Sequence, residues 1–277
     1  MRIAQLQLSV QEETEKNLDG LERMMEQAAS EKPDLVTAGE MFTCPYVTEK
    51  FPAYAEPEGG RTWQRLSALA AAHHVYLAAG SVPERDEAGR IYNTAYVFDR
   101  EGRQIAKHRK VHLFDIYLEN GDGYRESATL TPGDHFTVFD TEFGRIGVLI
   151  CFDIRFAEAA RIEADCGAKA ILVPGAFNMT TGPAHWELSF RMRAVDNQVF
   201  MIGTSDARNP DSGYTSWGHS ILTDPWGRVV GQMEEQEGYM IHDIDLSMAD
   251  QIRRQLPILS ARRRDLYSIK TGEGVVE

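Results

Sequence analysis

Apolar and polar residues alternate along the chain with two different periods. Residues 3–10 alternate strictly, which predicts a β-strand. Leu18, Leu21, Met25 and Ala28 then recur at the spacing of one helix face. The same two patterns predict further helices at residues 63–70, 156–166 and 186–195, and further strands at 35–38, 75–79, 170–173 and 199–203.

Three other segments have the pattern of a β-hairpin, with two short apolar runs around a turn that contains glycine. They are residues 95–107, 136–150 and 218–230. Strands that alternate with helices indicate parallel pairing, whereas hairpins indicate antiparallel pairing, so mixed sheets with helices outside them are expected. The sequence therefore predicts an α/β protein. No repeat or Pro/Ser-rich linker divides it, which favours a single domain over residues 1–277.

Composition narrows the class of protein. The longest apolar run, residues 146–152, is strand-sized and far shorter than the roughly 18 residues that cross a bilayer, so no membrane partner is expected. A net charge of −13 disfavours nucleic-acid binding, because phosphate contacts need a basic face. The three cysteines form no CxxC pair, and residues 3–10 do not resemble a secretory signal. A cytoplasmic location is therefore expected.

The apolar run 146–150 ends in Cys151, and a helix is expected shortly after it. This arrangement places a thiol on a strand-to-helix elbow, which exposes a nucleophile above a sheet. Backbone N–H groups near a helix start can also lower the pKa of a thiol. A small thiol that simply completes a buried strand would explain this segment equally well.

Two further segments favour catalysis. Glu40 directly follows the strand expected at residues 35–38, and Lys110 lies in a basic segment after a hairpin strand. Alone, the first would be an ordinary loop acid and the second a solvated edge lysine. Together, Cys151, Glu40 and Lys110 supply a nucleophile, a base, an acid for departing ammonia and a positive charge for the oxyanion. The set therefore predicts amide hydrolysis through an acyl-thioester, without a metal or other cofactor.

The segments around these three residues resemble the Glu, Lys and Cys signatures of the nitrilase superfamily of carbon–nitrogen hydrolases. They are residues 39–42, 108–114 and 151–156, they follow the family's order, and the similarity extends over nearly the whole chain. Five further stretches resemble the omega-amidase branch, namely residues 44–46, 51–56, 174–178, 181–188 and 193–198.

The resemblance implies a four-layer αββα sandwich that usually pairs as a homodimer, with residues 257–277 expected at the subunit interface. It implies hydrolysis of the terminal amide of α-ketoglutaramate or α-ketosuccinamate to the dicarboxylate and ammonia. The family's second active-site glutamate falls on Glu126, which is expected to orient Lys110 or to position the substrate amide and water. Phe177 and Thr181 are expected on the pocket wall.

Arg155 lies four residues beyond Cys151, and an arginine fork is the natural receptor for the carboxylate of such a substrate. A surface ion pair with Glu158 is the alternative. His185 and Trp186 are expected to begin and anchor a helix rather than to touch substrate.

Two departures from the family and one pattern similar to a zinc motif affect this interpretation. Gly39 stands where most members have proline, and residues 117–123 differ from the usual loop beside the pocket, which affects the expected substrate size. His108 and His112 have HxxxH spacing, but the segment is expected to be extended and lacks the glutamate of the zinc motif, so no metal site is expected there.

Four other interpretations stay open, three of them enzymes. The same catalytic set could serve a deaminated-glutathione amidase, an N-carbamoyl-amine amidohydrolase or an aliphatic amidase. The receptor for the far end of the substrate separates these, because Arg155 with a short pocket favours a small keto-acid amide. A catalytically silent scaffold of the same fold is the alternative from a different class, although the complete Glu, Lys, Cys and Glu set argues against it.

Overall fold

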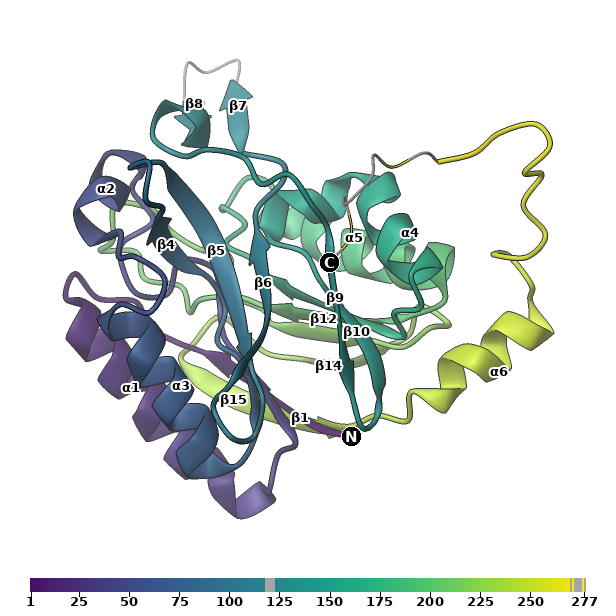
Figure 1. Cartoon of the computed structure of the whole chain (residues 1–277), viewed down its shortest axis with the longest axis horizontal. Coiled ribbons are helices and arrows are strands. Elements are labelled where there is room, and N and C mark those ends of the chain that lie inside the picture. The colour runs from purple at the N-terminus through teal and green to yellow at the C-terminus, as the bar shows by residue number, and fades with distance from the viewer. Residues whose placement is uncertain (118–122, 270, 272–275, 277) are drawn as a thin grey trace.

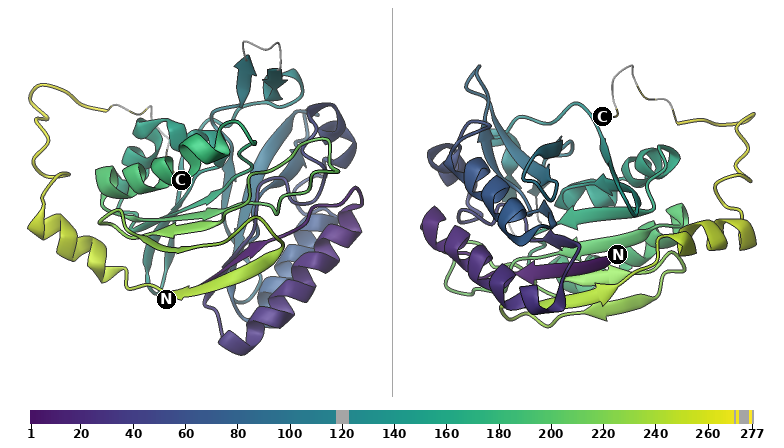
Figure 2. Two further views of the ribbon diagram at one scale, coloured as in Figure 1. Left: turned by 180° about the vertical axis from the view of Figure 1, so that it is seen from behind. Right: turned by 60° about the horizontal axis from the view of Figure 1, so that its bottom comes forward.

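The computed structural model describes residues 1–117, 123–269, 271 and 276. Two β-sheets lie face to face at the centre, and helices cover the outer face of each sheet (Figure 1). Figure 2 shows the same layers from two further directions. The four-layer αββα prediction is confirmed.

The first sheet has seven strands within the described residues, in the order β15-β1-β2-β3-β5-β4, with β6 also paired to β5. The pairs β1–β2 and β2–β3 are parallel, and the other pairs are antiparallel. Helices α1 (Thr14–Ala28) and α3 (Arg61–His73) cover its outer face. Its strands are β1 (Arg2–Gln7), β2 (Leu35–Thr37), β3 (Tyr76–Ala78), β4 (Val82–Arg85), β5 (Ile91–Phe98), β6 (Gln104–Arg109) and β15 (Gly238–Asp243).

The alternating pattern of β1 explains how this sheet sits between two layers. Ala4 and Leu6 face the helices, whereas Ile3 faces the second sheet. Gln5 shares the inner face with Ile3, and its Nε2 donates a hydrogen bond of 2.8 Å to the carbonyl oxygen of Gly203. A buried amide needs such a partner, so this contact joins the two sheets without leaving a polar group unsatisfied.

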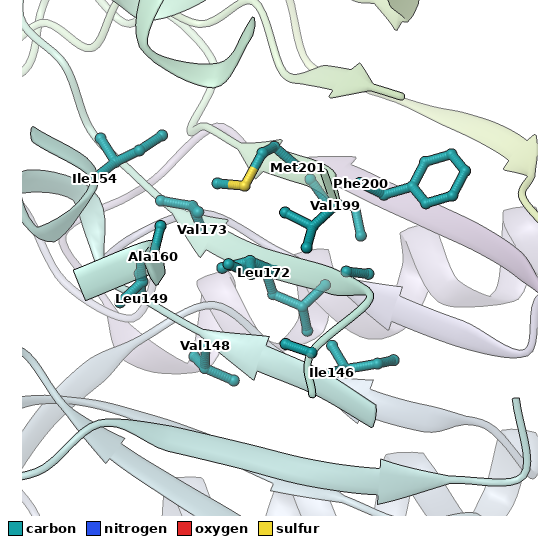
Figure 3. Packing of buried hydrophobic residues seen from close by; sticks show 14 of the residues in the cluster. Ile146, Val148, Leu149, Ile154, Ala160, Leu172, Val173, Val199, Phe200 and Met201 are labelled. Carbon is teal, nitrogen blue, oxygen red and sulfur yellow. The ribbon is translucent and has the colours of Figure 1, made fainter. Parts of the chain in front are cut away.

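The second sheet has six strands within the described residues, in the order β14-β13-β12-β11-β10-β9, and β10, β11 and β12 are parallel. Helices α4 (Ala157–Asp165) and α5 (Gly182–Asn197) pack on its outer face. Figure 3 shows the apolar side chains that fill this part of the core, among them Val148, Leu172 and Met201. Its strands are β9 (Thr137–Thr141), β10 (Gly144–Val148), β11 (Ala170–Pro174), β12 (Phe200–Thr204), β13 (Ile221–Thr223) and β14 (Val229–Gln232).

The remaining elements are short or lie at the edges. Strands β7 (Asp115–Tyr117) and β8 (Gly123–Arg125) form a small separate hairpin. Helix α6 (Ser247–Gln255) follows β15. None of the helices in the described part of the chain has the length and apolar character needed to span a membrane. The other elements are α2 (Phe51–Tyr54) and the 3-10 helices η1 (Ala29–Glu31), η2 (Thr48–Lys50), η3 (Glu126–Ala128) and η4 (Cys151–Arg155).

Each helix and strand predicted from the sequence is present, but several elements were not predicted. The most important of these is β15, which pairs antiparallel with β1 along the whole of β1. Its side chains are only partly buried, so its apolar alternation is weak. The assignment of residues 1–277 to a single domain stays a prediction.

Candidate active site

Four residues predicted to be catalytic come from separate segments and meet at one place. Glu40 follows β2 and Lys110 follows β6, so the first sheet supplies both. Cys151 follows β10 of the second sheet and begins η4, and Glu126 begins η3. The side chains of Glu40, Lys110 and Glu126 are fully buried, and Cys151 is 4% exposed. The site therefore lies inside the protein, where the two sheets come together.

The backbone turns sharply at the ends of β2 and β10. Met41 and Cys151 have φ angles of +54° and +44°, in the left-handed region that residues with a Cβ atom seldom adopt. The N–H of Met41 donates a hydrogen bond of 3.0 Å to Ser81 Oγ. At the other turn, the N–H of Ile150 donates a hydrogen bond of 3.0 Å to the Asp153 carboxylate. These contacts fix two otherwise unfavourable turns beside the buried charges.

Lys110 bridges the two glutamates. Its Nζ donates hydrogen bonds of 2.8 Å to Glu40 Oε1 and 2.9 Å to Glu126 Oε1. Burial alone would lower the pKa of Lys110, but the charges of Glu126 and Glu40 raise it well above its usual value. Burial raises the pKa of Glu126, and Lys110 opposes that effect. The lysine is therefore a permanent positive charge, held between two acids.

Each oxygen of Glu40 has a fixed partner. Oε1 accepts a hydrogen bond of 2.8 Å from Asn93 Nδ2 in addition to the one from Lys110. Oε2 accepts one of 2.9 Å from the N–H of Ala176. The hydroxyl of Tyr46 lies 3.1 Å from Glu40 Oε1 and 2.6 Å from an oxygen of Glu126. These contacts leave the carboxylate little freedom to rotate.

The structure changes the expectation for the Cys151 thiol. Burial and the charge of Glu40 raise its pKa well above the usual value, and the opposing charge of Lys110 does not compensate. A backbone N–H does lower this pKa, as such groups can, but burial and the nearby carboxylate outweigh it. Glu40 is the charged group that raises the pKa of the thiol most. The surroundings of the sulfur thus favour its protonated form, and Glu40 is the neighbouring carboxylate.

Asp153 organises the segment beneath the thiol. Its carboxylate accepts hydrogen bonds of 2.8 Å from both the N–H and the Nδ1 of His112, and its other oxygen lies 3.4 Å from His108 Nε2. These contacts hold the pKa of Asp153 far below its usual value, although burial opposes them. The two histidines of the HxxxH pattern therefore serve as partners of one buried carboxylate. Only the first part of this segment is extended as expected, because β6 ends at Arg109 and residues 111–112 form a bend.

One group in the described part of the chain has metal-ligand spacing. Ligand atoms of His219, Glu234 and Glu235 lie within 4.8 Å of one another. They come from the segments before β13 and after β14 rather than from the segments around Cys151. Arg208 Nη1 lies 3.9 Å from Glu235 and already supplies positive charge there.

Arg155 is half-buried and forms no ion pair with any residue that the structure describes. The alternative of an ion pair with Glu158 is therefore wrong. Its guanidinium lies over the ring of Phe177, 4.6 Å from the ring centre, and 5.7 Å from the ring centre of Phe152. Burial lowers the pKa of Arg155, and the proximity of Cys151 opposes this effect. Arg155 is thus a cation without a carboxylate partner among the residues that the structure describes.

Phe177 and Thr181, the two residues expected on the pocket wall, have different surroundings, and their role there stays a prediction. Phe177 is buried, and the guanidinium of Arg155 lies over its ring. Thr181 instead donates hydrogen bonds of 2.8 Å and 2.9 Å, from its N–H and its hydroxyl, to Asn178 Oδ1. This contact builds the turn before α5. The departure noted at residues 117–123 falls largely on residues 118–122, which lie outside the described part of the chain.

Sequence reasoning did not assign roles to several groups that hold the site. Tyr46 was quoted only as part of a family-like stretch, although its hydroxyl joins both glutamates. Asn93 lies in an ordinary strand pattern, and Ala176 contributes only its backbone N–H. A backbone donor has no signature in a sequence, so only the fold reveals it.

A sandwich that buries a thiol beside a carboxylate and an ammonium group has what is needed to transfer an acyl group from nitrogen to sulfur and then to water. The fold and site thus define a class, the hydrolases of carbon–nitrogen bonds other than peptide bonds. The chain belongs to the carbon-nitrogen hydrolase family, whose sequence model matches residues 2–254.

Known proteins resemble the chain over nearly its whole length. It is 45% identical over 270 residues to omega-amidase NIT2 of Mus musculus, covering 98% of each chain. The crystal structure of Saccharomyces cerevisiae Nit3 is 39% identical, with a TM-score of 0.87 over 95% of this chain and 96% of that one. An amidase from Nesterenkonia sp. AN1 is 25% identical, with a TM-score of 0.80 over 96% of this chain and 95% of that one. That structure is of a glutamate-to-glutamine mutant, in which the acetamide moiety of fluoroacetamide is attached to the active-site cysteine.

Proposed function

We propose that the chain is an omega-amidase. It hydrolyses the terminal amide of α-ketoglutaramate and α-ketosuccinamate to the dicarboxylate and ammonia. The likeness to omega-amidase NIT2 supports this substrate class. The observation that carries the proposal is Arg155, a half-buried cation beside Cys151 that has no acidic partner among the described residues. A small substrate with a carboxylate at its far end would complete this pair.

The first half of the reaction forms an acyl-thioester. Glu40 takes the proton of the Cys151 thiol, and the sulfur attacks the amide carbonyl carbon. The carbonyl oxygen becomes an oxyanion, which the Lys110 ammonium stabilises. When the C–N bond breaks, Glu40 returns the proton to the departing nitrogen, which leaves as ammonia. Glu126 is a positioning residue in this scheme, because it holds Lys110 through a hydrogen bond of 2.9 Å.

The second half of the reaction returns the enzyme to its starting state. Glu40 takes a proton from water, and the resulting hydroxide attacks the thioester carbonyl carbon. Lys110 stabilises the second oxyanion. The C–S bond then breaks, and the thiolate of Cys151 recovers the proton from Glu40. The new carboxyl group releases its proton to water, and the product leaves as the dicarboxylate. The raised pKa of the Cys151 thiol suits this scheme, because it makes a built-in base necessary in the first step.

Arg155 and Phe177 form the specificity site in this proposal. The guanidinium binds the substrate carboxylate, and the Phe177 ring supports the guanidinium from one side at 4.6 Å. Thr181, expected on the pocket wall, contributes through the turn that begins α5.

We also propose that the protein acts in the cytoplasm as a homodimer. All three cysteines are free thiols, which suits a reducing compartment. The C-terminal segment exposes large apolar side chains, with Leu266 71% and Tyr267 58% exposed, and a second copy would cover them. Light scattering after size exclusion should give about twice the mass of one chain. A monomeric mass would contradict the dimer.

The decisive experiment measures ammonia release from α-ketoglutaramate by the purified protein, with Cys151→Ala as the control. We expect release by the wild type and none by the variant. A trapped thioester of Cys151, seen as a mass increase of the intact protein after rapid acid quenching, would identify the intermediate. A wild type that hydrolyses only deaminated glutathione, N-carbamoyl amines or aliphatic amides would replace the substrate assignment and keep the mechanism. No amidase activity, together with a Cys151 that is no more reactive than the other two cysteines, would favour the silent scaffold.

A further inference from the structure

His185 makes a contact that the sequence did not suggest. It lies in the first turn of α5, is exposed to solvent, and its Nδ1 lies 3.0 Å from Arg155 Nη1. An arginine side chain has only donors and keeps its proton in proteins. The guanidinium therefore donates, and Nδ1 of His185 must accept. An imidazole can accept only when it is neutral and carries its proton on the other nitrogen, Nε2.

A neutral acceptor is suited to this position. A glutamate or aspartate in place of His185 would hold Arg155 equally firmly, but it would also cancel its charge. The imidazole fixes one edge of the guanidinium and leaves the positive charge available to a ligand. Phe177 supports the face of the same group at 4.6 Å without adding charge. The arginine is thus oriented by two neutral side chains.

Helix α5 holds both ends of Arg155. Arg193, also on α5, donates hydrogen bonds of 3.0 Å to the carbonyl oxygen of Arg155 and 2.8 Å to that of Ile154. The helix start is itself anchored, because the buried ring of Trp186 donates a hydrogen bond of 2.7 Å from Nε1 to the carbonyl oxygen of His219. One rigid element therefore places the backbone of residue 155 and the acceptor for its side chain.

We propose that His185 is a positioning residue that determines specificity: its neutral imidazole holds the Arg155 guanidinium in the orientation that receives the substrate carboxylate. This inference rests on the proposed function, because it assigns Arg155 to the far end of the substrate. His185 does not take part in the chemistry at Cys151. Its removal should therefore weaken the binding of substrates that carry a carboxylate and leave bond cleavage unchanged.

The test compares three substitutions of one exposed side chain. His185→Phe keeps an aromatic ring and removes the acceptor, His185→Gln keeps an acceptor oxygen, and His185→Glu keeps an acceptor but adds a negative charge. KM and kcat are measured for α-ketoglutaramate and for butyramide, a neutral amide without a carboxylate. His73→Phe, the same substitution on α3, is the matched control. Thermal unfolding of each variant checks that the fold is kept.

We expect His185→Phe to raise KM for α-ketoglutaramate about tenfold with kcat unchanged, the loss of one hydrogen bond to a charged group. His185→Gln should stay close to the wild type, and His185→Glu should raise KM further than His185→Phe. None of the three should change the kinetics with butyramide, and His73→Phe should change neither substrate. A merely structural role would affect both substrates alike, and that result would overturn the inference.

The outcomes separate this inference from the function on which it rests. If the wild type cleaves α-ketoglutaramate and the His185 variants have the same KM, the inference is overturned and the proposed function stands. If the wild type does not cleave α-ketoglutaramate, the proposed function fails. Calorimetric titration of the protein with glutarate then decides the inference. Weaker glutarate binding by His185→Glu than by the wild type supports it. Glutarate binding that does not depend on residue 185, or no binding at all, overturns it.

Discussion

Replacing Lys110 with methionine tests the central charge arrangement of the site. The substitution keeps the length of the side chain and removes the charge between Glu40 and Glu126. Lys110 Nζ is fully buried and lies 2.8 Å from one carboxylate and 2.9 Å from the other. Removing one partner from a buried ion pair costs about 3–5 kcal/mol, because it leaves a buried charge uncompensated. For a chain of 277 residues this corresponds to a fall in Tm of about 6–10 °C.

The penalty should depend on pH. Burial and the charge of Glu40 raise the pKa of Glu126 in the folded protein, and removing the lysine removes the charge that opposes them. A group with a raised folded pKa keeps its contribution to stability below the unfolded pKa and loses it as the pH rises through the folded pKa. Lys110→Met should therefore lose more stability, relative to the wild type, at pH 8 than at pH 5.

Urea unfolding followed by tryptophan fluorescence at both pH values measures this penalty. The double variant Lys110→Met/Glu126→Gln removes one of the two charges, and we expect it to regain about 1–3 kcal/mol relative to the sum of the single variants. Lys16→Met is the control, because Lys16 pairs with Glu13 on the surface, where both side chains are more than half exposed. It should change stability by less than about 1 kcal/mol. Equal penalties at pH 5 and pH 8, or strict additivity in the double variant, would refute the reasoning.

Three further predictions follow from the buried groups. Tyr46→Phe removes a hydroxyl that lies 2.6 Å from Glu126, so we expect kcat to fall about tenfold and the free energy of unfolding to fall by about 1–2 kcal/mol. Steady-state kinetics and urea unfolding measure the two effects. An unchanged kcat would show that the hydroxyl does not support the site. Burial and the charge of Glu40 raise the pKa of Asp206, whose stabilising contribution is therefore lost as the pH rises through its folded value. Asp206→Asn should accordingly raise Tm at pH 8 and lose that advantage towards pH 4, and a gain independent of pH would contradict this. Iodoacetamide should label Cys151 much faster than the other two cysteines, because Glu40 can take the proton of the Cys151 thiol. Peptide mass spectrometry measures the three labelling rates. Similar rates for all three cysteines would favour the silent scaffold.

Periodicity alone determined most of the layers. The strict alternation of residues 3–10 and the helical spacing from Leu18 to Ala28 each indicate which side of an element is buried. Periodicity predicts these elements because the burial of one side in the fold produces the apolar pattern in the sequence. Strand β15 was not predicted because its side chains are only partly buried and its pairing with β1 joins segments far apart in the chain. A pattern of burial does not specify such a long-range partner.

The sequence also determined which reactive side chains are available for catalysis. Glu40, Lys110, Cys151 and Glu126 could be named from residue type and motif, because amide hydrolysis requires a nucleophile, a base and a cation whatever the fold around them. Lys110 comes within hydrogen-bond distance of Glu40 because β2 and β6 belong to one sheet. Cys151 joins this group only because the second sheet packs against the first.

Only the tertiary structure decided the properties that depend on surroundings. The raised pKa of the Cys151 thiol results from burial and the charge of Glu40, which local sequence does not contain. The same is true of Arg155, which has His185 and Phe177 rather than Glu158 as its neighbours. Electrostatic energies depend on the distance between charges and on their exclusion from water, and both are set by contacts between residues far apart in the chain. The sequence determines which groups are present, and the fold determines which charges they carry and what they face.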